Sequence, residues 1–195
     1  VHCCYYLNEP SLEGRYKIVR MHNIEHVYYK NLAKIEKNVF KKYFFSSEAE
    51  RLKKFQKKLK AAEMIAAISP DDEKLLRLKF KNVFYVPVFH ENIKVTSETG
   101  VGKFALYHGN LGVGENNEAA LYLVKKVFNT LDYPLIIAGN SPTKELQKAV
   151  AESINIILES KLNTSSINEL IKTAHVNVLP TFQNTGMKLK LINVL

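Results

Sequence analysis

The second half of the chain alternates short apolar runs with segments in which apolar residues recur at helical spacing. The apolar runs occupy 104–108, 134–138, 154–158 and 175–180. They are continuously apolar rather than alternating, which is typical of parallel strands covered on both faces. Parallel strands need a crossover helix between them. This order therefore predicts a doubly wound α/β domain with ligands at the carboxyl ends of its strands.

Polar residues indicate where the helices of this half begin. We expect helices over 116–130, 142–152 and 166–174, and a last helix from about Met187. For the second, Ser141 followed by Pro142 predicts a capped start. For the helix over 166–174, Ser165 or Ser166 together with Glu169 predicts a capping box.

A glycine-rich turn, Gly109 to Gly114, joins the first strand of this half to its helix. A helix N-terminus presents unpaired N–H groups and a partial positive charge, so such a turn can bind phosphate. The alternative is a tight turn that needs glycine only for its backbone conformation. The turn is no Walker loop, because Phe104 follows Gly102-Lys103 where that motif has Ser or Thr. It is no dinucleotide fingerprint either, since the second strand ends at Asn140 rather than at an acid.

A second set of candidate residues stands at the start of the last expected helix. Thr185 and Gly186 place backbone N–H groups there that can face an anion. Lys188 and Lys190 are two residues apart and cannot share a helix face, so at most one of them points toward a ligand. Asn193 lies one turn beyond Lys190, so these two side chains can act together.

The first half of the chain contains the pieces of another α/β layer. We expect strands over 15–21, 63–68 and 83–87, and helices over 25–60 and from Ser69-Pro70 to Phe80. Ser47 with Glu50 predicts a break in the long helical segment near Ser46.

The organisation of the chain follows from a change in composition. Residues 90–103 are polar and lack periodicity, which is typical of a linker. The expected domains are therefore 1–89 and 104–195, with 90–103 between them. The chain starts without Met and stops inside an apolar-periodic segment, so we expect an interior fragment of a longer protein that is inactive alone.

His22 and His26 form an H-x-x-E-H pattern with Glu25. This pattern matches the inverted zinc-protease motif, which needs both histidines on one helix face and a third protein ligand. Because His22 directly follows a strand, we favour a polar cluster at the strand end, facing a cleft between the domains. A zinc hydrolase remains an alternative, although we expect no metal site.

The net charge of +9 is concentrated between residues 30 and 60. In segment 51–60, Leu52, Phe55 and Leu59 form one stripe and five lysines occupy the other faces. Such a segment is either a solvated face over a packed stripe or a dock for an anionic membrane surface. Nucleic-acid binding is not expected, because no aromatic residues interleave with these lysines.

The sequence indicates a cytoplasmic protein. No run approaches the roughly 20 apolar residues that span a bilayer, and the N-terminus lacks the basic region of a signal peptide. The adjacent Cys3 and Cys4 are expected to stay reduced, as in the cytosol. With the basic segment, this suggests a position that is peripheral at the inner membrane face.

Together these pieces resemble the group 1, nucleotide-sugar-dependent glycosyltransferases of the GT-B fold. Residues 108–120 are similar to the family's G-N-L-x-x-x-x-N-x-E-A opening of the C-terminal domain, and 135–142 to its I-x-G-x-x-P unit. Residues 176–181 followed by 186–193 are similar to V-x-P-(S/T) and G-x-K-x-K-x-L-E. Two runs of the first half, 19–25 and 65–71, look like the end of the N-terminal domain.

The resemblance implies a GT-B-like α/β fold, with a doubly wound C-terminal domain and the later part of a Rossmann-like N-terminal domain. It also implies a retaining hexosyltransferase, mannosyltransferase-like, that uses a nucleotide-diphosphate sugar. The acceptor is expected to be a polysaccharide or a lipid-linked glycan, and no cofactor is expected.

The resemblance also implies roles for the candidate residues. Donor-binding positions are Gly109, Asn110, Gly139, Asn140, Thr185, Gly186, Lys190 and Asn193. Among them, Thr185, Gly186 and Lys190 would hold the phosphates, where charge builds as the nucleotide leaves.

The chain has amides where the family pattern has the acids of the donor site. Asn193 takes the place of the glutamate that grips the ribose, and amides occupy the region of the other acid at Gln183 and Asn184. These amides favour an alternative, a non-catalytic relative that binds a sugar nucleotide or a partner. His22 is a candidate for the acceptor side.

Overall fold

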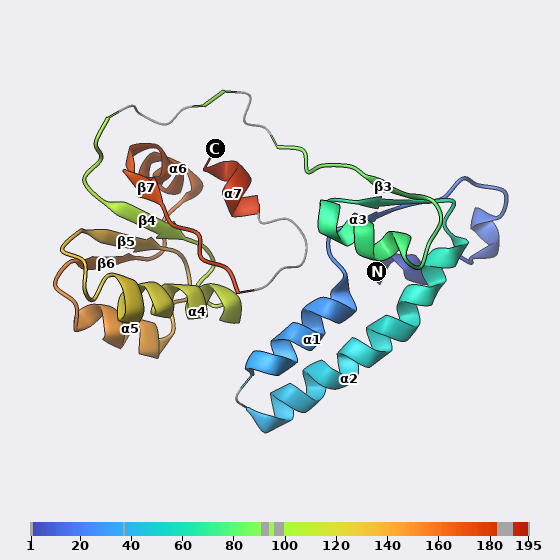
Figure 1. The fold of residues 1–195 in the computed structure, drawn as a ribbon, viewed down its shortest axis with the longest axis horizontal. Helices are drawn as coiled ribbons and strands as arrows, with labels where there is room; N and C mark the ends of the chain where they lie inside the picture. The colour runs from blue at the N-terminus through green and yellow to red at the C-terminus, as the bar shows by residue number, and fades with distance from the viewer. Residues whose placement is uncertain (1, 37, 91–93, 96–99, 183–188, 195) are drawn as a thin grey trace. The chain divides into compact units, whose positions relative to one another are not determined.

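The structure is a computed structural model that describes residues 2–36, 38–90, 94–95, 100–182 and 189–194 (Figure 1). The chain divides into two compact units. Unit 1 reaches to Phe89, and unit 2 runs from His90 to Phe182 and includes the described C-terminal residues. Each unit contains its own parallel sheet.

Unit 1 is built on a three-stranded parallel sheet in the order β1-β2-β3. Its strands are β1 (Ile18–Met21), β2 (Met64–Ala67) and β3 (Val83–Tyr85), with helix α3 (Pro70–Arg77) between the last two. The predicted start of α3 is confirmed, since the Ser69 hydroxyl accepts a hydrogen bond from Asp72 N at 3.4 Å. The strands are shorter than predicted but lie at the predicted places.

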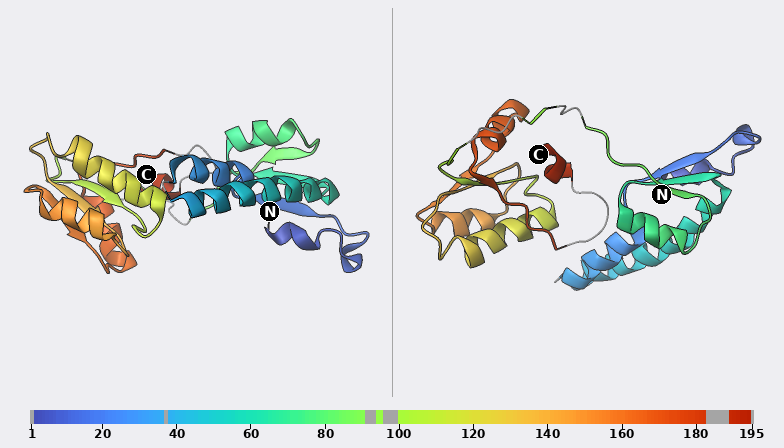
Figure 2. Two further views of the ribbon diagram at one scale, coloured as in Figure 1. Left: turned by 90° about the horizontal axis from the view of Figure 1, so that it is seen from below. Right: turned by 45° about the horizontal axis from the view of Figure 1, so that its top comes forward.

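A helical hairpin connects β1 to β2 in unit 1 (Figures 1 and 2). It consists of α1 (Glu25–Ile35) and α2 (Val39–Phe55), and a 3-10 turn over Gln56–Ala61 leads on to β2. The prediction of a break near Ser46 is wrong, because Ser46 lies inside α2. The break comes before α2, where the Asn38 side chain accepts a hydrogen bond from Lys41 N at 3.1 Å and caps the new helix.

Unit 2 contains a four-stranded parallel sheet in the order β6-β5-β4-β7. Its strands are β4 (Ala105–His108), β5 (Leu135–Ala138), β6 (Ile156–Glu159) and β7 (Val176–Asn177). Its helices are α4 (Gly114–Tyr122), α5 (Lys144–Ala151), α6 (Thr164–Thr173) and α7 (Leu189–Asn193). The chain moves outward from β4 to β6 and then crosses back to pair β7 with β4, so the predicted doubly wound topology is confirmed.

The core of unit 2 lies between its sheet and the helices α4 and α5. Ala105 and Tyr107 of β4 face this side together with Leu135 and Ile137 of β5, and all four are fully buried. A π-helical turn, Leu123–Val127, continues α4 over the same core. Helix α6 covers part of the opposite face (Figure 1).

Two helix caps differ from the sequence prediction. Helix α5 is capped by Thr143, whose hydroxyl accepts from Leu146 N, whereas Ser141 has a positive φ of 57° in the preceding loop. Helix α6 is capped by Asn163 rather than by a serine. In the described part of the chain, no helix is long and apolar enough to cross a membrane.

Candidate functional site

Four of the predicted donor-binding residues lie at one edge of the sheet of unit 2. Gly109 and Asn110 directly follow β4, and Gly139 and Asn140 directly follow β5. Strands β4 and β5 pair in parallel, with His108 opposite Ala138, so both pairs of residues emerge side by side at the carboxyl ends. This is the edge where open α/β sheets bind ligands.

The two loops approach each other too closely for a side chain at Gly139. A Cβ atom placed there would overlap the carbonyl oxygen of Gly109 and would lie 3.1 Å from the Leu111 side chain. The backbone is joined across the same gap, since Gly109 N donates to Ala138 O at 3.0 Å and Leu111 N donates to Asn140 O at 2.9 Å. Gly139 is therefore required by packing of backbone on backbone.

The amides of the turn itself are used inside the protein. Besides Gly109 and Leu111, Gly112 N donates to the Asn110 side chain at 3.1 Å and Val113 N donates to Asn110 O at 3.2 Å. Asn110 thus shapes the turn. The sequence predicts bare N–H groups in this turn, but these four N–H groups already donate hydrogen bonds within the protein.

The N-terminus of α4, which follows the turn, keeps the features of an anion site. Its first residue is Gly114, and the preceding Val113 has no side chain that could cap the helix. The first N–H groups and the positive end of the helix dipole therefore point out of the helix. Glu115 in the first turn supplies a negative charge, and its carboxylate accepts a hydrogen bond from Thr181 Oγ1 at 3.0 Å.

Lys190 brings a positive charge to the same place. Its Nζ donates to Asn116 Oδ1 at 2.9 Å and lies 3.5 Å from the hydroxyl of Tyr107, 4.9 Å from the centre of that ring. It also lies 3.2 Å from the position of a Cβ atom on Gly109. The structure therefore brings Lys190, Gly109 and the start of α4 together.

His108, the last residue of β4, belongs to this cluster but was missed by the sequence analysis. Its side chain is only 6% exposed, and its Nε2 is buried without a hydrogen-bond partner among the described residues. Burial, and to a smaller extent the charge of Lys190, lower the pKa of His108 to about 4. A polar residue that ends a buried apolar strand is the signal that could have identified it.

The remaining donor-site predictions have different outcomes. Asn193 is exposed at the end of the short helix α7, one turn from Lys190. Asn140 is tied to the next loop, because its side chain accepts a hydrogen bond from Lys161 N at 3.0 Å. Thr185 and Gly186 lie outside the described residues. The roles of all these residues in donor binding stay predictions.

His22 lies in unit 1, exposed just beyond the end of β1. It precedes α1, whose first residues are Glu25 and His26, so the two histidines do not share a helix. The zinc motif requires that they do. Among the residues that the structure describes, no three His, Cys, Asp or Glu side chains are grouped to hold a metal ion.

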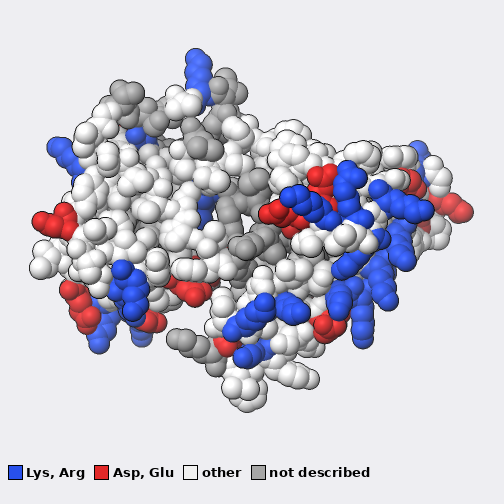
Figure 3. Space-filling view, in the orientation of Figure 1, with Lys and Arg blue, Asp and Glu red and all other residues white. Residues whose placement is uncertain are grey.

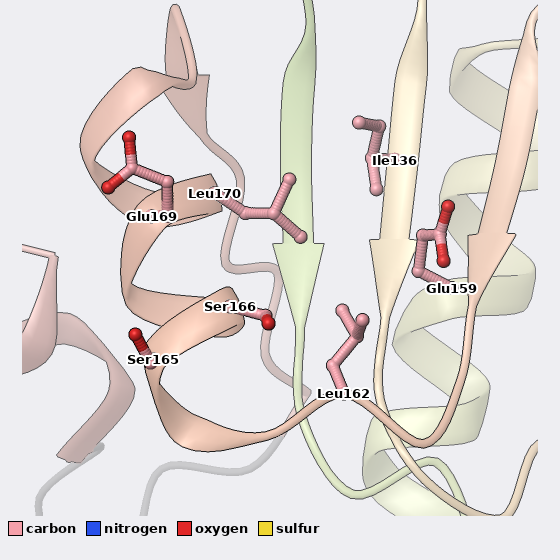
Figure 4. Close-up of a pocket in the computed structure, with 7 residues that line it drawn as sticks. All are labelled: Ile136, Glu159, Leu162, Ser165, Ser166, Glu169 and Leu170. Atoms are coloured by element: carbon pink, nitrogen blue, oxygen red, sulfur yellow. The ribbon is translucent and has the colours of Figure 1, made fainter.

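A pocket of about 490 Å³ opens on the face of unit 2 that α6 partly covers (Figure 4). Its apolar part consists of Ile136, Leu162 and Leu170, and its rim carries Ser165 and Ser166. Two carboxylates, Glu159 and Glu169, also line it. Their charge disfavours a diphosphate, whereas the apolar floor and the hydroxyl groups suit an uncharged group.

Replacing Gly139 with Ala tests the packing of the two loops. The added methyl group would collide with the Gly109 carbonyl, so we expect the free energy of unfolding to fall by more than about 2 kcal/mol. Urea unfolding measures this. Gly114→Ala is the matched control, because a Cβ atom there meets nothing within 4 Å. An equal effect of both substitutions would contradict the close approach.

The low pKa of His108 predicts a pH-dependent stability. The unfolded imidazole has a pKa near 6.5, so between pH 6.5 and 4 only the unfolded chain takes up the proton, and stability falls as the pH falls. The contribution lost between pH 7.5 and pH 5 is about 2 kcal/mol. Urea unfolding at both pH values should show a smaller loss for His108→Leu than for wild type. An unchanged loss would mean that the imidazole is solvated.

The chain is similar to known proteins in sequence and in structure. No family model matches the chain. A curated Klebsiella pneumoniae protein, described as an uncharacterized 44.6 kDa protein in the cps region, is 27% identical over 204 residues. The match covers 94% of this chain and 50% of that protein, so the chain spans about half the length of this relative.

Two crystal structures share the architecture. That of TarM matches with a TM-score of 0.64 and 13% identity, over 93% of this chain and 35% of TarM. A point mutant of S. aureus TarM, in complex with fondaparinux, alpha-GlcNAc-glycerol and UDP, matches with a TM-score of 0.56 and 12% identity, over 91% of this chain and 34% of that one. At these identities the likeness establishes the fold, and the prediction of a GT-B-like architecture with parallel sheets is confirmed.

Proposed function

We propose that the protein is a glycosyltransferase that moves a sugar from a nucleotide-diphosphate sugar to a polysaccharide or lipid-linked acceptor. The observation that carries the proposal is the position of Lys190 beside Gly109 and the start of α4. A fixed cation and a helix N-terminus converge there at the carboxyl edge of a parallel sheet. This combination suits a diphosphate.

The same groups can lower the barrier to sugar transfer. When the bond between the anomeric carbon and the phosphate oxygen breaks, negative charge builds on the departing diphosphate. Lys190 is already held by Asn116 and Tyr107, so little reorganisation is needed to meet that charge. In this proposal the lysine neutralises the leaving group, and the donor site uses no metal cofactor.

The comparisons support the substrate classes. A structurally similar protein is complexed with UDP and with alpha-GlcNAc-glycerol, which is in keeping with a nucleotide-sugar donor and a glycan acceptor. The relative from the cps region supports a role in making a polysaccharide. Retention of configuration and a mannosyltransferase-like hexosyl transfer rest on the sequence resemblance alone.

A second candidate is a non-catalytic relative that binds a sugar nucleotide or a partner. The observation in its favour is Asn193, an exposed amide where the resemblance leads us to expect a glutamate on the ribose. Transfer of sugar by the protein would exclude this candidate. Binding of the donor without turnover would support it.

Nucleotide binding tests the donor site directly. We expect the protein to bind at least one of UDP, GDP, dTDP and ADP in titration calorimetry. In Lys190→Met, a charge-assisted hydrogen bond is lost and binding should weaken about tenfold or more. Lys125→Met is the matched control, because Lys125 is an exposed lysine of the same unit paired with Glu145. Equal binding by wild type and Lys190→Met would contradict the proposed site.

We further propose a peripheral position on the cytoplasmic face of an anionic membrane. The apolar stripe of segment 51–60 cannot insert into lipid, because Leu52 and Leu59 are buried in unit 1. Its lysines remain on the surface, and Figure 3 shows basic side chains gathered over α2. This segment can therefore contribute electrostatic attraction.

Exposed apolar residues lie instead at the start of α2. Phe40 is 87% exposed and Tyr43 is 77% exposed, and Val39 and Phe44 lie beside them. Phe45, in contrast, packs against Tyr29 of α1. Contiguous apolar patches of this kind mark interaction sites. The exposed Lys41 and Lys42 stand between Phe40 and Tyr43 in α2, so an anionic bilayer fits this patch.

Vesicle sedimentation tests the membrane proposal. The protein should bind vesicles that contain phosphatidylglycerol more strongly than vesicles of phosphatidylcholine alone, and the difference should shrink in high salt. Phe40→Ser with Tyr43→Ser should weaken binding at least tenfold. Leu78→Ser is the control, since Leu78 is 79% exposed in unit 1 but lies outside the hairpin. Binding that is unchanged in the double variant would overturn this proposal.

A further inference from the structure

His108 carries a polar atom that the described structure leaves without a partner. The side chain is 6% exposed, and Nε2 is fully buried with no hydrogen bond. A buried polar atom without a partner costs roughly 1–3 kcal/mol, so such an atom is rare in a native protein and points to a bound water or ligand as its partner. The question is which molecule pairs with Nε2.

The position of His108 indicates a ligand of the donor site. His108 is the last residue of β4 and directly precedes Gly109. A Cβ atom at Gly109 would lie 3.2 Å from Lys190 Nζ. The charge of Lys190 contributes, after burial, to lowering the pKa of His108. His108 therefore stands at the same carboxyl edge as the groups assigned to the diphosphate.

The chemical state of the ring suits a hydrogen bond to that ligand. The environment keeps the imidazole neutral at pH 7, so one ring nitrogen donates and the other accepts. A neutral ring adds a directional N–H group without adding a second positive charge beside Lys190. An oxygen of a diphosphate or of its sugar is an acceptor for this N–H.

We propose that His108 Nε2 donates a hydrogen bond to the nucleotide-sugar donor and is a donor-contacting residue of this site. The inference rests on the proposed function, since it presupposes that the site binds a sugar nucleotide. It adds to that function a contact from the strand itself, beside those from the loop and from Lys190.

A buried water is the competing account of the unpartnered atom. Asn177 Oδ1, on the neighbouring strand β7, is also buried without a partner in the described structure, while its amide donates to Ile171 O at 3.2 Å. A water could serve both atoms. Such a water would stabilise the fold only. Replacing either residue would then shift the melting temperature alike and leave nucleotide binding unchanged.

Three variants separate these accounts: His108→Leu, His108→Gln and Asn177→Leu. Gln can place a donor N–H near the position of Nε2, whereas Leu cannot. We expect His108→Leu to weaken binding of the best nucleoside diphosphate about tenfold, by calorimetry at pH 7.5, and His108→Gln to recover most of that loss. Asn177→Leu should leave binding within about twofold of wild type.

The melting temperature of each variant provides the second readout. If His108→Leu and Asn177→Leu shift it alike and neither changes nucleotide binding, the water account holds and the proposal is overturned. Equally weak binding by His108→Gln and His108→Leu would also overturn it, because a restored donor would then have no effect. If wild type binds no nucleoside diphosphate, the proposed function itself fails, which is a distinct result.

Discussion

The candidate site depends on the contact between the backbones of Gly109 and Gly139. Parallel pairing of β4 and β5 ends both strands at one level, and the absence of a side chain at Gly139 lets the second loop lie directly against the first. Two amide-to-carbonyl bonds, from Gly109 and Leu111, then fix the turn. A turn held in this way sets where α4 begins. The absence of a side chain at Gly109 leaves room for the ammonium group of Lys190 beside it.

The charges of the site balance around that fixed backbone. Lys190 and the start of α4 are positive, Glu115 is negative, and His108 is neutral because it is buried. A bound diphosphate would add negative charge, which Lys190 and the start of α4 can neutralise. The hydrogen bonds of Lys190 to Asn116 and Tyr107 keep the cation in place before the ligand arrives. Preorganisation of this kind is what lowers a barrier in which charge develops on a leaving group.

Much of the fold could be predicted from the sequence because it follows from periodicity. The apolar runs at 104–108 and 134–138 gave the parallel strands, and Ser69-Pro70 gave the start of α3. Local competition between caps was harder to judge. Helices α2, α5 and α6 are capped by Asn38, Thr143 and Asn163. The sequence instead suggested a break at Ser46 and caps at serines, because several residues nearby can cap a helix equally well.

The candidate site was predictable in part for the same reason. Glycines after a strand and a lysine in the last helix are visible in the sequence, and the structure brings Gly109, Gly139 and Lys190 to one edge. Two of the occupied amides, Gly109 N and Leu111 N, donate to the strand and loop around Ala138 and Asn140, and these partners could not be identified from the sequence of the turn alone. The burial of His108 and its unpartnered nitrogen are properties of the folded unit, so the sequence shows only a polar residue at the end of an apolar strand.

The most direct test of the account is an NMR titration of the isotope-labelled protein with a nucleoside diphosphate. We expect the largest shifts in the backbone amides of Gly114 and Asn116, at the start of α4, and in the side chain of Lys190. Saturable binding that leaves the resonances of 109–116 and Lys190 unchanged would contradict it, because the diphosphate would then occupy another part of the molecule.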